Sequence, residues 1–314
     1  MSRGLGDVYK RQIQMDEITL KALAKINLGL DVVRRREDGY HEVRMIMQTI
    51  HLYDLLEIQK IREPGIQIVS NLSFLPVNEN NLVYKAARLL QEEFALTDGI
   101  SVKLTKRIPV AAGMAGGSTD AAAMLYAMNQ LYDLGLSRRE LMKRGVQIGA
   151  DVPYCLMRGT ALAEGIGEKL TQLPPMIKCP VLIAKPSISV STRFVYQNLK
   201  LDEQTNHPDI DALMKDIREK DFDGVCAHMG NVLESVTIPN YPVIAEIKQQ
   251  MMRSGAKASM MSGSGPTVFG LFTNQTAAQA AYEELRYGSS QDLAKQVYLT
   301  SFYNRKGHAD GEQF

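Results

Sequence analysis

A glycine-rich stretch in the first half of the chain has the composition of a phosphate-binding loop. "PVAAGMAGGST" (109–119) follows a period-two apolar segment at 100–104 and precedes an apolar stretch with helical spacing. A strand, a glycine-rich loop and a helix N-terminus bring unpaired backbone amides and the positive end of the helix dipole to one point, which favours a bound phosphate. Ser118 and Thr119 add hydroxyls in the first helical turn, and Asp120 is a candidate to cap the helix or to approach a metal. The alternative is a turn whose small residues only let the helix pack closely.

Two widespread nucleotide-binding motifs do not account for this loop. A P-loop needs GxxxxGK[ST], and the sequence contains no Gly-Lys-Ser or Gly-Lys-Thr. The dinucleotide-binding pattern GxGxxG does not match the loop either. The spacing of its glycines therefore belongs to another class of phosphate site.

Lys25 and Asn27 occupy alternate positions of a predicted strand. From Ile18 to Val32 the even-numbered residues are apolar and most odd-numbered residues are polar. This period-two pattern predicts a strand with one buried face. Lys25 and Asn27 then project from the polar face about 7 Å apart, so that both could reach one ligand.

Several elements must hold these residues in place. The segment "REDGYH" (36–41) is typical of a turn, and the residues after it alternate as strands do. An Asn-rich start and helical spacing predict a helix over about 82–94, and a second helix is predicted over about 118–133. Ser137 and Glu140 form a capping-box pair, which predicts the start of a third helix.

A Pro-rich segment, "TQLPPMIKCP", marks a predicted domain boundary. It separates a first domain over 15–172 from a second over 173–303, in which strands and helices alternate again. Residues 1–14 show no helix or strand period, and we expect them to be an extension outside the fold. We expect residues 304–314 to form a tail.

Composition and charge exclude several classes of protein. The 314 residues include 36 Lys and Arg against 35 Asp and Glu, so no net field favours nucleic acid or an anionic membrane. The three cysteines form no CxxC pair, which argues against a disulfide framework or a zinc site and favours a reducing, cytoplasmic compartment. No apolar run approaches the roughly 18 residues of a membrane span. We therefore expect a cytoplasmic protein with a small-molecule partner, no metal site, no nucleic acid and no membrane; the oligomeric state is open.

Four segments together resemble one known family. "PVAAGMAGGSTDAAA" is similar to the PxxxGxGxSSAA-type motif of the GHMP kinases, which bind ATP through this loop. "AKINLGLDVVRRREDGYHEV", "GADVPYCLMRGTALAEGIGE" and "SGSGPTVFGLF" resemble further signature segments of one branch of that family, in the matching order over about 18–303. The loop departs from the motif at Ala111, Ala112 and Ala115, where some relatives have glycine, and at Thr119, where many have serine. These replacements are small or keep the hydroxyl.

The resemblance implies an α+β fold of two domains. The first would resemble the second domain of ribosomal protein S5, the second would be ferredoxin-like, and the substrate would lie between them. ATP would be the phosphoryl donor, with Mg²⁺ as its companion. The residues implied to bind ATP are Pro109, Val110, Ala111, Ala112, Gly113, Met114, Ala115, Gly116, Gly117, Ser118 and Thr119.

By the same resemblance, Asp151 and Lys25 are the catalytic residues. Asp151 would accept the proton of the substrate hydroxyl, since a carboxylate with a reference pKa near 3.9 is ionised at neutral pH. Lys25 would keep Asp151 ionised and stabilise the transferring charge. Asn27 would hydrogen-bond the substrate or Asp151. Without the family resemblance, an Asp here is usually a helix cap or turn residue and a strand Lys is usually solvated.

The resemblance also implies residues that recognise a cytidine group. The Tyr40 ring would stack on the base and His41 would bond its edge. Tyr196 would supply the opposite stacking face, with Phe194 as the alternative. "SGSGPTVFG" (262–270) would approach a diphosphate or brace the ATP loop; otherwise it is a tight strand connection between two domains.

The activity implied is phosphorylation of the 2-hydroxyl of 4-diphosphocytidyl-2-C-methyl-D-erythritol, a step of the non-mevalonate isoprenoid pathway. One alternative is another GHMP kinase, such as a homoserine or mevalonate kinase, and Tyr40 with His41 argues against it because those substrates carry no base. The other is a silent binding protein on the same fold or an S5-like RNA-binding module. Lys25, Asp151 and the intact loop argue against the former, and the balanced charge argues against the latter.

Overall fold

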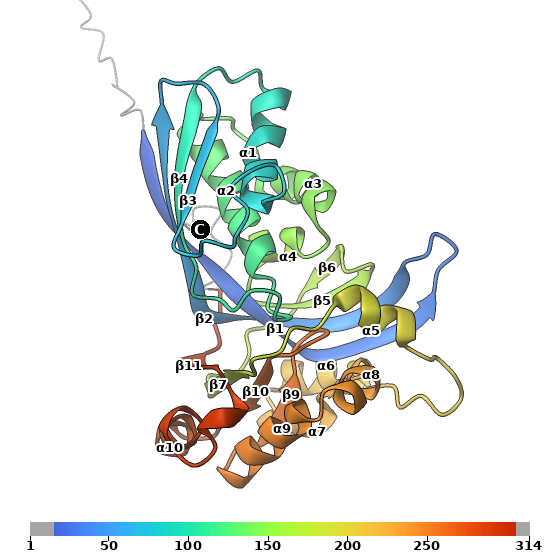
Figure 1. Cartoon of the computed structure of the whole chain (residues 1–314). Helices are drawn as coiled ribbons and strands as arrows, with labels where there is room; N and C mark the ends of the chain where they lie inside the picture. Colours follow the sequence, from blue (N-terminus) through green and yellow to red (C-terminus); the bar gives the residue numbers. More distant parts are fainter. Residues whose placement is uncertain (1–15, 306–314) are drawn as a thin grey trace, which may run out of the picture.

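The computed structural model describes residues 16–305 of the chain. The predicted extension over 1–14 and residues 306–314 of the predicted tail lie outside the described residues. The described chain forms two β-sheets with helices packed against them, and Figure 1 shows the first half of the chain above the second. No helix among the described residues has the length and apolar character needed to cross a membrane.

The first sheet is built on one long antiparallel hairpin, β1 (Glu17–Arg35) and β2 (His41–Ile61). Its strand order is β3-β4-β2-β1-β8, and β5 pairs with β2 while β6 pairs with β5. The hairpin turn contains Gly39 at φ +85°, a left-handed conformation that glycine adopts without a steric penalty. The other strands are β3 (Ile66–Ser70), β4 (Gly99–Thr105), β5 (Thr160–Gly165), β6 (Lys169–Gln172) and β8 (Gly230–Asn231).

Capping side chains fix where two helices of the first half begin. In α1 (Leu82–Glu93), the Asn81 side chain accepts a hydrogen bond from the Val83 amide at 2.9 Å. In α3 (Arg138–Ile148), Ser137 and Glu140 form the predicted capping box. Each cap satisfies amides that the first helical turn leaves unpaired, so both predicted helix starts are confirmed.

Helix α2 (Gly116–Leu131) begins earlier than the predicted position 118, so Gly116 and Gly117 belong to its first turn. Its alanines at 121–123 are fully buried, and they let α2 pack against the sheet and the short helix α4 (Val152–Met157). Figure 1 shows α1 to α4 on one face of the first sheet. The larger apolar core lies between these helices and that face.

The central part of β1 is buried on both faces, so the prediction of a single buried face is wrong. Irregularities in its pairing with β2 lie on either side of Lys25 and Asn27. Outside them, Ala22 and Leu30 pack in the core beneath the helices, whereas Ile26 packs in a core formed with the second half of the chain. Lys25 and Asn27 therefore turn toward the helices, as β-bulges near active sites often re-aim side chains.

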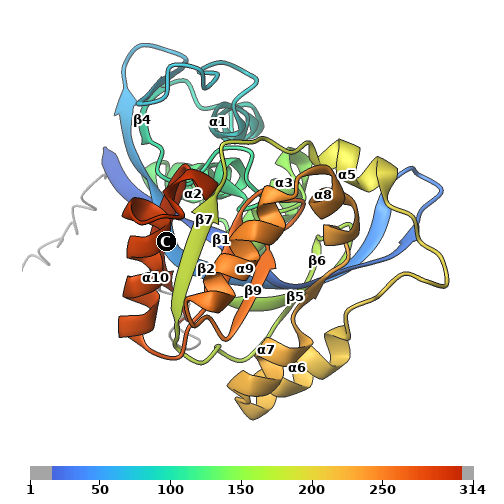
Figure 2. The same ribbon diagram turned by 60° about the horizontal axis from the view of Figure 1, so that its bottom comes forward.

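The second sheet has the order β11-β7-β10-β9 and is antiparallel throughout. Along the chain, helices lie between β7 and β9, β9 and β10 form a hairpin, and α10 precedes β11. This is the β-α-β-β-α-β order of ferredoxin-like folds. Figure 2 shows α9 and α10 beside this sheet. The predicted α+β class is confirmed.

The elements of the second half have the following bounds. The strands of the second sheet are β7 (Pro180–Lys185), β9 (Ala258–Met261), β10 (Val268–Leu271) and β11 (Gln296–Ser301). The helices are α5 (Thr192–Asn198), α6 (Ile210–Glu219), α7 (Phe222–His228), α8 (Glu234–Asn240), α9 (Val243–Arg253), α10 (Gln275–Tyr287) and the 3₁₀ turn η1 (Gln291–Leu293).

The two halves of the chain are joined by strand pairing. The proposed boundary near residue 173 falls between β6 and β7. However, β8 comes from the second half and pairs in parallel with β1 in the first sheet, and Ile50 of β2 forms a bridge with Phe302. The boundary remains a proposal, and the shared pairing fixes how the halves sit on each other.

Candidate active site

A cavity of about 1600 Å³ is lined by residues from both halves of the chain. Its lining comes from the β1–β2 hairpin, the loop before α2, residues 150–151, helix α5 and the turn at 263–265. All the sequence-predicted site residues are in this lining except Met114 and Thr119. The structure therefore brings together residues that the sequence places in separate segments.

The loop between β4 and α2 is shaped by residues in the left-handed conformation. Ala111, Gly113 and Ala115 have φ values of +51°, +74° and +56°. Such strain at non-glycine residues is found mainly at functional sites. The loop ends at Gly116, and the N-terminus of α2 faces the cavity. Unpaired amides and the helix dipole at this point can hold a phosphate group.

Two residues of the predicted ATP loop point away from the cavity. Met114 packs in the core shared with the second half of the chain, and the Thr119 hydroxyl donates to the Leu23 carbonyl at 2.8 Å. Ser118 is the first-turn residue with a hydroxyl that lines the cavity. The Met114 carbonyl accepts a hydrogen bond from the Lys25 amide at 3.2 Å, which ties the loop to β1 beside Lys25.

The connection between β9 and β10 braces this loop. The Ser262 hydroxyl donates to the Gly113 carbonyl at 3.0 Å. A Cβ added at Gly113 would lie 2.1 Å from the Ser262 carbonyl oxygen, so only glycine fits there. Asn231 holds the same connection by donating to the Met261 and Gly263 carbonyls. The segment therefore braces the loop, and it joins two strands of the second sheet rather than two domains.

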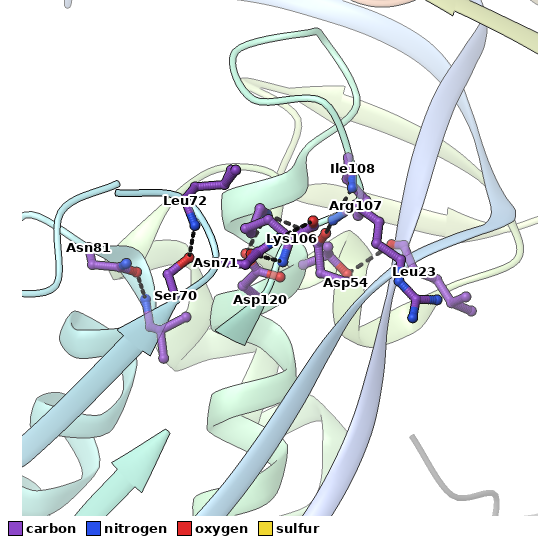
Figure 3. Close-up of polar contacts among 12 residues, drawn as sticks. Leu23, Asp54, Ser70, Asn71, Leu72, Asn81, Lys106, Arg107, Ile108 and Asp120 are labelled. Carbon is purple, nitrogen blue, oxygen red and sulfur yellow. Dashed lines mark hydrogen bonds and ion pairs between the residues drawn. The ribbon is translucent and has the colours of Figure 1, made fainter. Parts of the chain in front are cut away.

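A buried ion-pair cluster, which sequence reasoning missed, fixes both ends of the loop. Lys106, just after β4, contacts Asp54 of β2 and donates to Asp120 of α2 at 2.6 Å (Figure 3). Asp54 also accepts from the amides of Arg107 and Ile108 at 2.5 and 2.8 Å. The position preceding α2 is Ala115, so the prediction that Asp120 caps the helix is wrong. In the sequence, the sign of this cluster was Asp120, a carboxylate next to an apolar helical stretch.

Charge in this cluster is unbalanced, since two carboxylates share one ammonium. Burial raises the pKa of the Asp120 carboxyl well above its ordinary value, although the Lys106 ammonium opposes the rise. Burial alone would lower the pKa of Lys106, but Asp120 and Asp54 raise it. Lys106 therefore stays charged, and Asp120 gains a proton more readily than an exposed aspartate does.

Lys25 and Asp151 face each other in the cavity. The Lys25 Nζ donates to Asn27 Oδ1 at 2.7 Å and lies 4.0 Å from Asp151 Oδ2. The Lys25 side chain is 6% exposed and the Asp151 side chain is 32% exposed. Asp151 directly precedes α4, and within the described residues its carboxylate makes no capping hydrogen bond to that helix. A partly exposed carboxylate beside a buried ammonium is free to accept a proton from a bound hydroxyl.

Three aromatic residues lie at another part of the lining. The rings of His41 and Tyr196 are 5.1 Å apart between centroids and tilted, while Tyr40 is 61% exposed. Burial lowers the pKa of His41, helped by the nearby Arg35, so the imidazole is neutral at neutral pH. Burial raises the pKa of the Tyr196 phenol, which therefore stays protonated. Phe194, the alternative to Tyr196, is 38% exposed and is not in the lining drawn from residues 16–305.

Asn27 is fully buried and lies in the lining beside Lys25, where it holds the Lys25 ammonium rather than Asp151. Over the described residues there is no group of three or more His, Cys, Asp or Glu side chains that could hold a metal ion. A Mg²⁺ ion carried by a nucleotide needs few protein ligands, because it keeps several waters and binds the phosphates.

Comparisons with known proteins agree with this geometry. The model of the GHMP kinases N terminal domain matches residues 81–159, and that of the GHMP kinases C terminal domain matches 213–289. A protein of Lachnospira eligens named 4-diphosphocytidyl-2-C-methyl-D-erythritol kinase is 58% identical over 92% of this chain and 99% of its own length. The chain belongs to the GHMP kinase family. A protein of the same name from Lachnoclostridium phytofermentans is 56% identical to this GHMP kinase over 93% of this chain and 99% of its own length.

Solved structures of GHMP kinases share the fold. A crystal structure of 4-(cytidine 5'-diphospho)-2C-methyl-D-erythritol kinase matches with a TM-score of 0.78 at 31% identity, over 91% of this chain and 99% of that one. Homoserine kinase from Cytophaga hutchinsonii matches with a TM-score of 0.76 at 22% identity, over 93% and 96% of the two chains. The second match shows a common fold alone.

Proposed function

We propose that this GHMP kinase transfers the γ-phosphoryl group of ATP to the 2-hydroxyl of 4-diphosphocytidyl-2-C-methyl-D-erythritol, in non-mevalonate isoprenoid precursor biosynthesis. The observation that carries the proposal is the set of residues that line one cavity. It is lined by the glycine loop, the Lys25 and Asp151 pair, and the Tyr40, His41 and Tyr196 cluster. The names of the relatives supply the substrate, and the cavity contains a group suited to each part of it.

The nucleotide end of the cavity is suited to ATP. The loop over 109–115 and the N-terminus of α2 border the cavity and can offer it backbone amides, and Ser118 adds a hydroxyl. Mg²⁺ accompanies the nucleotide as part of the substrate and neutralises charge on the phosphates. Ser118, in the first turn of α2, carries a side-chain hydroxyl that faces the cavity and can join its ligands.

The transfer step assigns separate roles to Asp151 and Lys25. Phosphoryl transfer needs an aligned hydroxyl, a proton acceptor and positive charge near the transferring group. Asp151 accepts the proton of the attacking hydroxyl, and the Lys25 ammonium stabilises charge in the transition state. Because Asn27 holds Lys25, the ammonium is fixed without a direct hydrogen bond to Asp151 at 4.0 Å.

The aromatic cluster would favour a substrate that carries a nucleobase. Tyr40 and Tyr196 supply two ring faces, and base stacking on an aromatic ring is sequence-tolerant and worth about 1–3 kcal/mol. His41, neutral at neutral pH, presents one donor and one acceptor to the edge of a cytosine. Mevalonate and homoserine carry no ring that could use these groups.

A panel of alcohols tests the proposal. The purified protein is incubated with ATP, Mg²⁺ and either 4-diphosphocytidyl-2-C-methyl-D-erythritol, mevalonate or homoserine, and ADP release is followed. We expect turnover with the cytidine-linked alcohol alone. Turnover of mevalonate or homoserine, without turnover of the cytidine-linked alcohol, would overturn the substrate assignment.

A further inference from the structure

A buried hydrogen-bonded ring centred on Tyr154 links α4, the helix after Asp151, to β2, the partner strand of β1. Asp151 directly precedes α4, and Tyr154 lies one turn further along that helix. Lys25 on β1 pairs across the sheet with Thr49 on β2. Tyr154 thus belongs to the helix that follows Asp151, and Thr49 is the strand partner of Lys25.

The ring is closed and fully satisfied. The Tyr154 hydroxyl donates to the Gly159 carbonyl at 2.7 Å. The Gly159 amide donates to Thr49 Oγ1 at 3.0 Å, and because Tyr154 has already used its proton, the Thr49 hydroxyl donates to Tyr154 at 2.9 Å. The Thr49 amide donates to the Gly159 carbonyl at 3.0 Å.

The ring lies in the protein interior, where a lost hydrogen bond has the largest effect. Tyr154 is 1% exposed and Thr49 is 2% exposed. Burial raises the pKa of the Tyr154 phenol, so the hydroxyl keeps its proton at neutral pH. Arg158 and Gly159, which lead from α4 to β5, both have positive φ, so the chain leaves α4 through a turn that the ring holds in place.

We propose that Tyr154 is a positioning residue for the transfer reaction, and that its hydroxyl, through Thr49 and Gly159, holds α4 at the distance from β1 at which Asp151 meets Lys25. This inference rests on the proposed function, since it gives Asp151 the role of proton acceptor. Tyr154 would act through Asp151, since it is not among the described residues that line the cavity. A shift of α4 by a fraction of an ångström is enough to matter, because a misplacement of about 1 Å can cost roughly 100-fold in rate.

The direct test is Tyr154→Phe, which keeps the ring and removes the hydroxyl. We expect kcat to fall roughly tenfold, while KM for ATP and for the alcohol change less than about twofold. The matched control is Tyr132→Phe, because the Tyr132 hydroxyl also bonds a carbonyl, that of Gly99 at 3.4 Å, at the far end of α2. The control should keep wild-type kcat. Equal loss of kcat in both variants would overturn the proposal.

A second pair of variants covers the case in which Tyr154→Phe folds poorly. Thr49→Ser keeps the hydroxyl of the ring and should retain most of the wild-type kcat. Thr49→Val removes it at similar volume and should lower kcat about as much as Tyr154→Phe. If the serine and valine variants have the same kcat, the hydroxyl ring does not position the site.

A double-mutant cycle separates positioning from general loss of structure. In single-turnover reactions with enzyme in excess, Tyr154→Phe should lower the wild-type rate about tenfold but the residual rate of Asp151→Asn less than twofold, since the group it positions is already gone. Equal factors in both backgrounds would overturn the proposal. The cycle uses whichever alcohol the wild-type enzyme phosphorylates, so an incorrect substrate assignment would be seen separately in the wild-type panel.

Discussion

At the scale of single residues, the proposed chemistry depends on how freely Asp151 can accept a proton. Its carboxylate is partly exposed to the cavity, whereas the Lys25 ammonium is buried and held by Asn27. These contacts hold the ammonium in place and leave the carboxylate, the proposed base, open to the cavity. The same cavity presents Tyr40, the proposed stacking residue, which is mostly exposed.

Asp151→Asn should abolish most turnover and leave nucleotide binding unchanged. The amide keeps the size of the side chain but cannot accept the hydroxyl proton, and general-base catalysis contributes about 10²- to 10⁴-fold. We expect kcat to fall by that factor and the Kd for ATP, measured by calorimetry, to stay within about twofold. Asp223→Asn, at an exposed ion pair with Lys257, is the control. A wild-type kcat in Asp151→Asn would rule out Asp151 as the base.

Tyr40→Ala should weaken binding of the cytidine-linked alcohol and leave ATP unaffected. Loss of about 1–3 kcal/mol of stacking corresponds to a KM increase of roughly 5- to 150-fold for the alcohol. Steady-state kinetics with each substrate varied in turn measures both constants. Tyr287→Ala removes an equally exposed aromatic ring on α10 and should change neither. A similar rise in both KM values for Tyr40→Ala would argue against base stacking.

At the scale of elements, the loop before α2 depends on the β9–β10 connection as much as on its own glycines. Gly113 touches the Ser262 backbone, and the Ser262 hydroxyl bonds the Gly113 carbonyl. The loop is also tied to β1 through the Lys25 amide. A segment from each half of the chain therefore shapes the proposed ATP site.

Gly113→Ala should destabilise the protein and raise KM for ATP. Its φ of +74° already disfavours a Cβ, and that atom would meet the Ser262 carbonyl at 2.1 Å. We expect the free energy of unfolding to fall by about 2–4 kcal/mol, measured by urea denaturation. Gly135→Ala, at φ +65° in open space, should lose about 1 kcal/mol and keep the wild-type KM. The interpretation fails if the two variants behave alike.

Local patterns allowed part of this arrangement to be predicted from the sequence. The capping box at Ser137, the helix after the glycines and the pairing of Lys25 with Asn27 on one face all depend on residues a few positions apart. Which side chains of β1 lie on which face could not be predicted, because the β-bulges depend on the pairing of β1 with β2. The burial of the second face of β1 depends on residues from the other half of the chain.

Contacts between distant residues are the part that a single sequence does not contain. Lys106 meets Asp54 across 52 positions of the chain, and Thr49 meets Tyr154 across 105. Each residue alone looks like an ordinary strand or helix residue. These contacts, which hold the site residues in place, could therefore not be predicted without the fold.

At the scale of the whole molecule, stability and the proposed nucleotide site are coupled through the cluster of Asp54, Lys106 and Asp120. The cluster joins β2, the end of β4 and α2 at the base of the loop (Figure 3), and its side chains are almost fully buried. Within the described residues, Asp120 Oδ1 has no hydrogen-bond partner. A buried carboxyl in this state stabilises the fold best when it carries a proton.

Asp120→Asn should change how stability depends on pH. Because burial raises the Asp120 pKa in the folded protein, the folded state holds that proton after the unfolded chain has lost it. The wild-type contribution of Asp120 is therefore present below about pH 4 and is lost as pH rises toward the folded-state pKa. The stability of Asp120→Asn relative to wild type, from urea denaturation between about pH 5 and pH 8, should rise with pH. A relative stability that falls with pH would contradict this assignment.

The central claim is that one cavity delivers the γ-phosphoryl group of ATP to the 2-hydroxyl of a cytidine-linked alcohol. The most direct measurement is nuclear magnetic resonance of the product formed from 4-diphosphocytidyl-2-C-methyl-D-erythritol, ATP and Mg²⁺, with Asp151→Asn run in parallel. We predict a new phosphate monoester on carbon 2, an intact diphosphate bridge, and almost no product from the variant. A phosphate on another hydroxyl, or the same product rate from Asp151→Asn, would contradict the account.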